Sequence, residues 1–217
     1  MTAIAPERID AEQSGGCLRL TIDRPAARNA LTPAMFADLA AALRGVEVAT
    51  TRSVVLTGAG EMFSAGADLV AVRSTSPAAV RVALDEVLDA LDACPVPTLA
   101  RIPGPCVGAA LELALACDLR VCSQGAHFAL PAARLGIDYP RHGLARYVAV
   151  VGVANTRRIA LLGERIGSSE AAAMGLVHRV AADLDAAVTE WTDLLDANDA
   201  AAVNAMTRTL RTLGAAP

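Results

Sequence analysis

Two glycine-containing loops carry the first sign of chemistry in this sequence. Gly66-Ala67 and Gly108-Ala109 each follow a segment expected to be a strand. Backbone N–H groups exposed by such loops can converge on one oxygen atom that gains negative charge. Two preorganised donors stabilise such an oxygen, for example that of an enolate, by on the order of 3 kcal/mol each. The N–H groups of Ala67 and Ala109 are therefore the candidate donors.

Glu112 is the one acidic residue in a run of small and aliphatic residues from 108 to 117. Such a run predicts a buried helix, whose dipole adds positive charge at its start. Val107, Leu111 and Leu113 are expected to remove the carboxyl group from water, which suits proton transfer near neutral pH. The alternative is a structural glutamate that bonds to a neighbouring strand.

The elements that must position these residues alternate between strands and helices, which predicts an α/β fold. Patterning predicts strands at 17–23, 53–57, 98–102, 119–122 and 127–129. Capping residues and helical spacing predict helices at 33–43, from 77 to just before Pro95, at 108–117, around 159–162, after Ser168 as a cap, and twice between 183 and 213. The segment before Cys17 is expected to be a polar leader, and that from Gly58 to Ser76 irregular. With 217 residues, the chain is expected to form one domain.

The composition excludes several classes of function. The formal charge is −4 and the basic residues are spread along the chain, so no footprint for a nucleic acid is visible. All 19 basic residues are arginine, which excludes a Schiff-base lysine and leaves arginine to pair with phosphates. No apolar run approaches the roughly 18 residues that a membrane span needs, so we expect a cytoplasmic protein. The 5 cysteines form no C-x-x-C pair and predict neither a disulfide framework nor a metal site.

Four motifs in a fixed order give a more specific indication. They are R-P-A-A-R-N-A-L at 24–31, V-V-L-T-G-A-G at 54–60, F-S-A-G-A-D-L at 63–69, and a glycine-containing turn at 104–112. With Cys117-Asp118, Leu135-Gly136 and Gly175-Leu176-Val177, they resemble the enoyl-CoA hydratase/isomerase (crotonase) family over nearly the whole chain. The resemblance implies a crotonase-like (ClpP/crotonase) spiral of strand-strand-helix units, with a core at 1–165 and a helical C-terminal segment at 166–217.

The resemblance also implies a site for an acyl-CoA thioester. The catalytic groups would be the oxyanion donors Ala67 and Ala109 and the acid/base Glu112. Residues expected along the CoA are Arg28, Ala65, Gly66, Asp68, Leu69 and Gly108. CoA arrives as part of the substrate, so neither a separate cofactor nor a metal is expected. The high apolar content of 54% and the resemblance favour a homotrimer or dimer of trimers, with no nucleic-acid or membrane partner.

The sequence departs from the family pattern in two places. Family hydratases carry a second glutamate in a segment F-x-x-P-E, where this chain has Phe128 to Ala132. Asp138 or His142 would be the substitute for that acid, unless both are ordinary surface or subunit-contact residues. Relatives usually continue beyond the segment matched by 200–213, so we expect either a different cover for the CoA or weaker CoA binding.

Other polar residues are expected to be structural. They are His127, His178, Asp118 and Ser64, the last of which lacks the G-x-S-x-G surroundings of a serine nucleophile. The resemblance implies an enoyl-CoA hydratase that acts through a thioester enolate. The alternatives are an isomerase or decarboxylase that manages with one carboxylate, and a non-catalytic acyl-CoA-binding protein.

Overall fold

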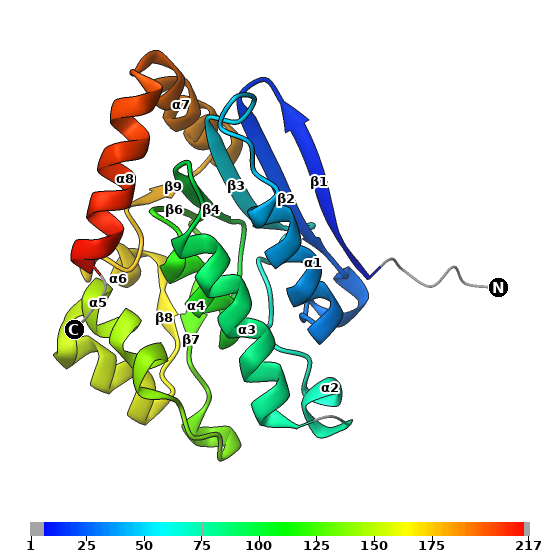
Figure 1. The fold of residues 1–217 in the computed structure, drawn as a ribbon. Helices are drawn as coiled ribbons and strands as arrows, with labels where there is room; N and C mark the ends of the chain where they lie inside the picture. The colour runs from blue at the N-terminus through cyan, green and yellow to red at the C-terminus, as the bar shows by residue number, and fades with distance from the viewer. Residues whose placement is uncertain (1–6, 75, 215–217) are drawn as a thin grey trace.

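A six-stranded sheet runs through the centre of the molecule (Figure 1). The computed structural model describes residues 7–74 and 76–214. In spatial order the sheet contains β1 (Arg8–Ser14), β2 (Cys17–Asp23), β3 (Ser53–Gly58), β4 (Thr98–Ile102), β6 (Leu119–Ser123) and β9 (Arg179–Ala181). β1 is antiparallel to β2, and every other neighbouring pair is parallel, with Val54 opposite Thr98 and Leu99 opposite Leu119. The α/β class predicted from the sequence is confirmed.

A smaller sheet and two groups of helices complete the fold. The smaller sheet contains β5 (Cys106–Val107), β7 (His127–Ala129) and β8 (Ile166–Gly167). The helices are α1 (Pro33–Arg44), α2 (Leu69–Ser74), α3 (Pro77–Asp92), α4 (Ala109–Ala116), α5 (Arg141–Leu162), α6 (Ser168–Ala173), α7 (Leu184–Ala197) and α8 (Ala200–Gly214), with 3₁₀ turns η1 (Pro25–Ala27) and η2 (Ala133–Leu135). The segment 166–217 is therefore not only helical, because it also supplies β8 and β9 to the two sheets.

Helix α4 is the buried helix predicted around Glu112. Seven of its residues are buried, from Ala110 to Ala116, and it lies between α3 and α5 (Figure 1). α3 begins at Pro77, with the Ser76 hydroxyl accepting a hydrogen bond from the Ala79 N–H, and buries an apolar stripe against α1 and α4. The central helix is thus held on two sides by helices that also contribute side chains to the candidate site.

Three local predictions were wrong, each for a physical reason. The polar leader contains β1, which alternates poorly because it is an exposed edge strand paired on one side only. The segment expected to be irregular contains α2, which is too short to show a helical period. Ser168 does not cap α6, because its hydroxyl donates to the Gln124 carbonyl and Gly167 is the N-cap.

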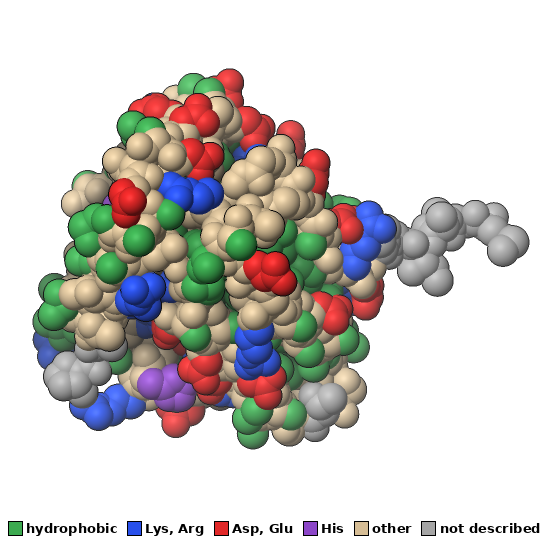
Figure 2. All heavy atoms as spheres, turned by 45° about the horizontal axis from the view of Figure 1, so that its top comes forward, with side chains coloured by type: hydrophobic (Ala, Val, Ile, Leu, Met, Phe, Trp, Pro, Cys, Tyr) green, Lys and Arg blue, Asp and Glu red, His purple; other side chains and the backbone are tan. Residues whose placement is uncertain are grey.

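The surface and the cysteines show no further specialised feature. Figure 2 shows basic and acidic side chains interspersed over one face rather than gathered in a basic patch. All 5 cysteines are free thiols. Within residues 7–74 and 76–214, no helix has the length and apolar character that crossing a bilayer requires.

Candidate active site

The two glycine-containing loops predicted from the sequence meet in the structure. The 65–69 segment forms a β-bridge with Leu31. The Leu31 N–H donates to the Gly66 carbonyl at 2.8 Å. The Asp68 N–H donates back to the Leu31 carbonyl at 2.8 Å. On the other side, the Val107 N–H donates to the Ser64 carbonyl at 3.1 Å, which joins this loop to the start of α4.

Glycine is required at the point of closest approach between the two loops. Gly66 has φ +90°, and a Cβ atom there would lie 2.5 Å from the Val107 carbonyl oxygen and 3.1 Å from the Ala109 nitrogen. The residue before Ala67 therefore packs directly against Ala109. In the described chain, neither the Ala67 nor the Ala109 N–H has a hydrogen-bond acceptor, so both remain available for an external oxygen.

Glu112 lies one helical turn after Ala109, on the same side of α4, and its side chain is fully buried. Its carboxylate is paired with Arg81 of α3. Arg81 Nη1 donates to Oε2 and Nη2 donates to Oε1, each at 2.9 Å. The apolar neighbours expected from the sequence are thus only part of the environment of this carboxylate, because a partly buried arginine faces it.

Tyr139 and Asp85 complete the polar surroundings of this pair. The Tyr139 hydroxyl donates to Glu112 Oε2, and Arg81 also donates to Asp85, whose Oδ1 lies 3.0 Å from His142 Nε2. Burial alone would lower the pKa of Arg81, but its bonds to Glu112 and Asp85 outweigh burial and raise it. Burial and the charge of Glu112 raise the pKa of Tyr139 well above its ordinary value. Tyr139 is therefore a neutral hydrogen-bond donor at physiological pH.

Gly143 lies close to Oε1 of the Glu112 carboxylate. A Cβ atom at this position would lie 3.0 Å from Glu112 Oε1 and 2.9 Å from Tyr139 Cε1. Helix α5 can approach the carboxylate this closely only because residue 143 has no side chain. The buried Glu112 thus lies near two N–H donors, that of Ala109 on the same helix and that of Ala67 on the neighbouring loop. Proton transfer beside a carbonyl requires such a combination of an acid/base and donors.

Comparison with known proteins shows to which family the chain belongs. The enoyl-CoA hydratase/isomerase family model matches residues 12–213. The chain belongs to this family. It is 37% identical over 177 residues to a Rhodobacter capsulatus protein described as a probable enoyl-CoA hydratase, with 80% of this chain and 68% of that protein covered.

Solved structures of family members share the fold. An enoyl-CoA hydratase/carnithine racemase from Magnetospirillum magneticum superimposes with a TM-score of 0.89 at 32% identity, covering 94% of this chain and 80% of that one. A Thermobifida fusca protein assigned to the enoyl-CoA hydratases, in complex with CoA, gives a TM-score of 0.86 at 31% identity, covering 96% and 86%. The crotonase fold implied by the sequence motifs is confirmed.

The segments expected to contact CoA lie side by side. The Ala65 N–H donates to the Arg28 carbonyl at 3.0 Å, so the Arg28 loop and the 65–69 segment run together. Arg28 has φ +56° and an exposed side chain, and the side chain of Leu69 is also exposed. Asp68 instead turns inward, since its Oδ2 accepts from Arg24 Nη1 at 2.5 Å and its Oδ1 accepts from the Val70 N–H at 2.7 Å. Its carboxylate therefore holds the loop.

Asn29 was not identified from the sequence as a site residue, although it belongs to the first motif. Its buried side-chain amide donates to the Ala59 and Met62 carbonyls, both at 2.9 Å, and its Oδ1 accepts from the Arg24 N–H at 3.1 Å. It joins the Arg28 loop to the loop after β3. The signal that could have identified it is its residue type, because asparagine tolerates the left-handed backbone conformation that it adopts here.

The position at which the resemblance implies a second glutamate carries only a methyl group. This residue, Ala132, is the N-cap of η2 and is almost completely buried. Of the three consecutive residues Asp138, Tyr139 and Pro140, it is Tyr139 that contacts Glu112. His142 is bound to Asp85 and is largely exposed, so it reaches Glu112 only through Asp85 and Arg81. Asp138 and His142 remain predictions as substitutes for the acid.

Three of the residues expected to be structural have partners within the fold. Asp118 accepts from the Thr98 N–H at 2.7 Å and from Arg211, and His178 Nδ1 accepts from the Arg120 N–H at 3.0 Å. The Ser64 hydroxyl donates to the Asn29 carbonyl at 2.7 Å and accepts from the Gly66 N–H at 3.0 Å. These contacts are the kind that a structural role requires.

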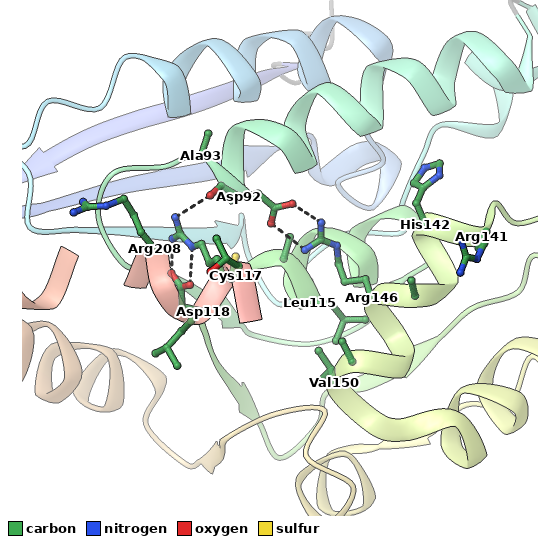
Figure 3. A pocket seen from close by; sticks show the side chains of 16 residues that line it. Asp92, Ala93, Leu115, Cys117, Asp118, Arg141, His142, Arg146, Val150 and Arg208 are labelled. Atoms are coloured by element: carbon green, nitrogen blue, oxygen red, sulfur yellow. Dashed lines mark hydrogen bonds and ion pairs between the residues drawn. The ribbon is translucent and has the colours of Figure 1, made fainter. Parts of the chain in front are cut away.

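One large groove of the molecule does not coincide with the candidate site. It has a volume of about 1080 Å³ and lies between the C-terminal end of α4, α5 and α8. Figure 3 shows Arg146 directed at Asp92 in this groove, with Arg141 and His142 on the α5 side. His142 is its only lining residue among those predicted for the site. Chemistry rather than volume therefore identifies the site at the opposite end of α4.

Proposed function

We propose that this protein transfers protons at the carbon atom beside the thioester carbonyl of an acyl-CoA. The Ala67 and Ala109 N–H groups bind the thioester oxygen as it becomes an enolate, and Glu112 accepts and returns the proton. The strongest support comes from the Ala67 and Ala109 N–H groups, which have no acceptor among the described residues. Glu112 is fully buried and lies on the same helix as Ala109.

The CoA part of the substrate is proposed to lie along the Arg28 loop and the 65–69 segment, with Gly108 at its reactive end. Support comes from the contact between these segments and from the related Thermobifida fusca protein, whose structure contains CoA. Leu69 and Arg28 offer an apolar and a cationic side chain at the surface, which suits a molecule with an apolar arm and phosphates. Assembly as a homotrimer or dimer of trimers remains a prediction.

Among the reactions of this family, the geometry supports double-bond isomerisation better than hydration. In isomerisation, Glu112 takes a proton from C2 of a 3-enoyl-CoA, the electron pair moves toward the thioester oxygen, and the proton returns at C4. No water is consumed. Hydration needs a second group to activate water, but Ala132 has no carboxylate and Tyr139 is a neutral phenol that cannot act as a base. Hydration of a 2-enoyl-CoA remains the second candidate.

Deuterium exchange tests the enolate without assuming the final product. Butyryl-CoA incubated with the protein in D₂O is expected to exchange its C2 protons, which mass spectrometry detects. Glu112→Gln should abolish the exchange, while calorimetry should still show butyryl-CoA binding. Binding without exchange by the unaltered protein would overturn the proposal and favour the non-catalytic acyl-CoA-binding protein.

Product analysis then separates the two reactions. A 3-enoyl-CoA should gain the absorbance of a conjugated enoyl thioester, and crotonyl-CoA should lose little of it. Rapid loss of that absorbance from crotonyl-CoA would favour hydration and would require a second proton-transfer group.

A further inference from the structure

Arg81 donates two hydrogen bonds to Glu112, and the sequence predicted no role for this arginine. An ionised carboxylate offers about four acceptor positions, two on each oxygen. Glu112 Oε2 accepts from Arg81 Nη1 and from the Tyr139 hydroxyl, so both of its positions are filled. Oε1 accepts from Arg81 Nη2 alone among the described residues. One acceptor position therefore remains, and it lies on Oε1.

The guanidinium group is itself held in place from several sides. Asp85, one helical turn along α3, accepts from Arg81 Nη2, and the Tyr139 ring lies with its centroid 5.8 Å from Arg81 Cζ. Only 19% of the Arg81 side chain is exposed. Since Asp85 is in turn bonded to His142 of α5, the guanidinium plane has little freedom to rotate.

We propose that Arg81 is a positioning residue, which orients the Glu112 carboxylate so that Oε1 alone exchanges a proton with the substrate carbon. The proposal rests on the proposed function, because it assigns how the same site uses its acid/base. Arg81 does two separable things: it brings a positive charge to the carboxylate, and its planar pair of N–H donors fixes the orientation. A lysine in its place would supply the charge without the two parallel hydrogen bonds.

Arg81→Met and Arg81→Lys separate the two effects. With a 3-enoyl-CoA as substrate, we expect Arg81→Met to lower kcat about 100-fold with little change in KM. Arg81→Lys should restore only part of kcat, since orientation is still lost. Arg146→Met is the matched control, because Arg146 makes a similar pair of bonds to Asp92, at 3.1 and 2.7 Å, away from Glu112.

Two outcomes would overturn the proposal. If both Arg81 variants lower the melting temperature but leave kcat of the folded fraction unchanged, Arg81 is structural only. If Arg81→Met increases turnover, the ion pair restrains Glu112 rather than orienting it.

A spectroscopic measurement keeps the proposal testable even if no turnover is found. The infrared difference between a protein and its Glu112→Gln variant reports the carboxyl group of Glu112 alone. We expect its bands to differ between the unaltered protein and the Arg81→Met background, because the two parallel hydrogen bonds from Arg81 are lost. Identical bands in both backgrounds would contradict the positioning role of Arg81, whereas absent turnover alone would contradict only the proposed function.

Discussion

The two ends of α4 carry two carboxylates, Glu112 and Asp118, that differ in how completely they are bonded. Each accepts two N–H groups from one arginine. Asp118 accepts from Arg211 Nε at 2.8 Å and from Nη2 at 2.6 Å. It also accepts from the N–H and the hydroxyl of Thr98, at 2.7 and 2.9 Å. Among the described residues, Asp118 thus has four donors and Glu112 has three.

The difference shows that an arginine pair does not by itself mark an acid/base residue. Asp118 joins α4 to β4 through Thr98 and to α8 through Arg211, so its donors come from elements that it ties together. Glu112 retains one acceptor position, beside Gly143, and lies one turn from an unpaired N–H. Spare hydrogen-bonding capacity next to other unpaired groups distinguishes a reactive site from a structural junction.

The largest expected effects come from removing each charge in turn. Glu112→Gln keeps the shape of the side chain but cannot accept a proton, so C2 exchange should fall at least about 1000-fold. Asp118→Asn should instead lower the free energy of unfolding by about 2 kcal/mol, because it weakens charge-assisted bonds, and leave exchange per folded molecule unchanged. Mass spectrometry and urea titration measure the two quantities. A loss of exchange in folded Asp118→Asn would break the comparison.

The next largest effect concerns the N–H donor of α4. Ala109 is the first residue of the helix, where proline is tolerated because its missing N–H would have no intrahelical partner. Gly108, with φ 60° and ψ −124°, has the mirror image of the extended conformation that proline requires before it. Ala109→Pro should therefore keep the fold and lower exchange by about 100-fold, by removing one oxyanion donor. Circular dichroism checks the fold, and unchanged exchange would exclude Ala109 as a donor.

A smaller effect tests the open acceptor position on Glu112. The methyl group of Gly143→Ala would lie 3.0 Å from Oε1, where the substrate proton is proposed to arrive. Exchange should fall about tenfold, since α5 and the Tyr139 ring must move by a few tenths of an ångström to make room. Gly125→Ala is the control, because no atom lies within 4 Å of a Cβ there. Full activity of Gly143→Ala would show that the free position is not used.

The backbone half of the site could be predicted from the sequence, and the side-chain half could not. A glycine precedes each of Ala67 and Ala109, and Glu112 follows Ala109 by three residues. This pattern is local, because helical geometry alone places Ala109 and Glu112 on one face. Arg81 is 31 residues from Glu112, and in sequence it forms an ordinary i,i+4 pair with Asp85. Only the packing of α3 on α4 turns two of its N–H groups toward Glu112.

The same limit applies to Tyr139 and to the edges of the fold. Asp138 and His142 were the natural candidates by chemical type, but the direction of a loop decides which of several adjacent side chains faces inward. The strands at 17–23 and 98–102 were predicted with the bounds that the structure shows, because the first alternates apolar and polar residues as a half-buried strand does, and the second is almost completely buried. The exposed β1 gives no such signal.

The ion pair between Arg24 and Asp68 extends the comparison to a third carboxylate. Its removal should have the smallest of the expected effects. Asp68 Oδ2 accepts from Arg24, and Oδ1 accepts from the N–H groups of Val70 and Ala71 at the start of α2. Burial alone would raise the pKa of Asp68, but these bonds outweigh burial and lower it. Like Asp118, this carboxylate is bonded on both oxygens and is expected to stabilise the fold.

Because the folded state binds the Asp68 proton less readily than the unfolded state, this contribution is present above the unfolded pKa of about 3.9. It is lost as the pH falls through the lower folded pKa. Asp68→Asn should therefore reduce the free energy of unfolding by about 1 kcal/mol at pH 7, and the difference from the unaltered protein should vanish toward pH 2. Urea titrations across that range measure it. A difference independent of pH would mean that the asparagine alters the α2 cap rather than the ion pair, and Asp68 would then not belong with Asp118 as a charge that stabilises the fold.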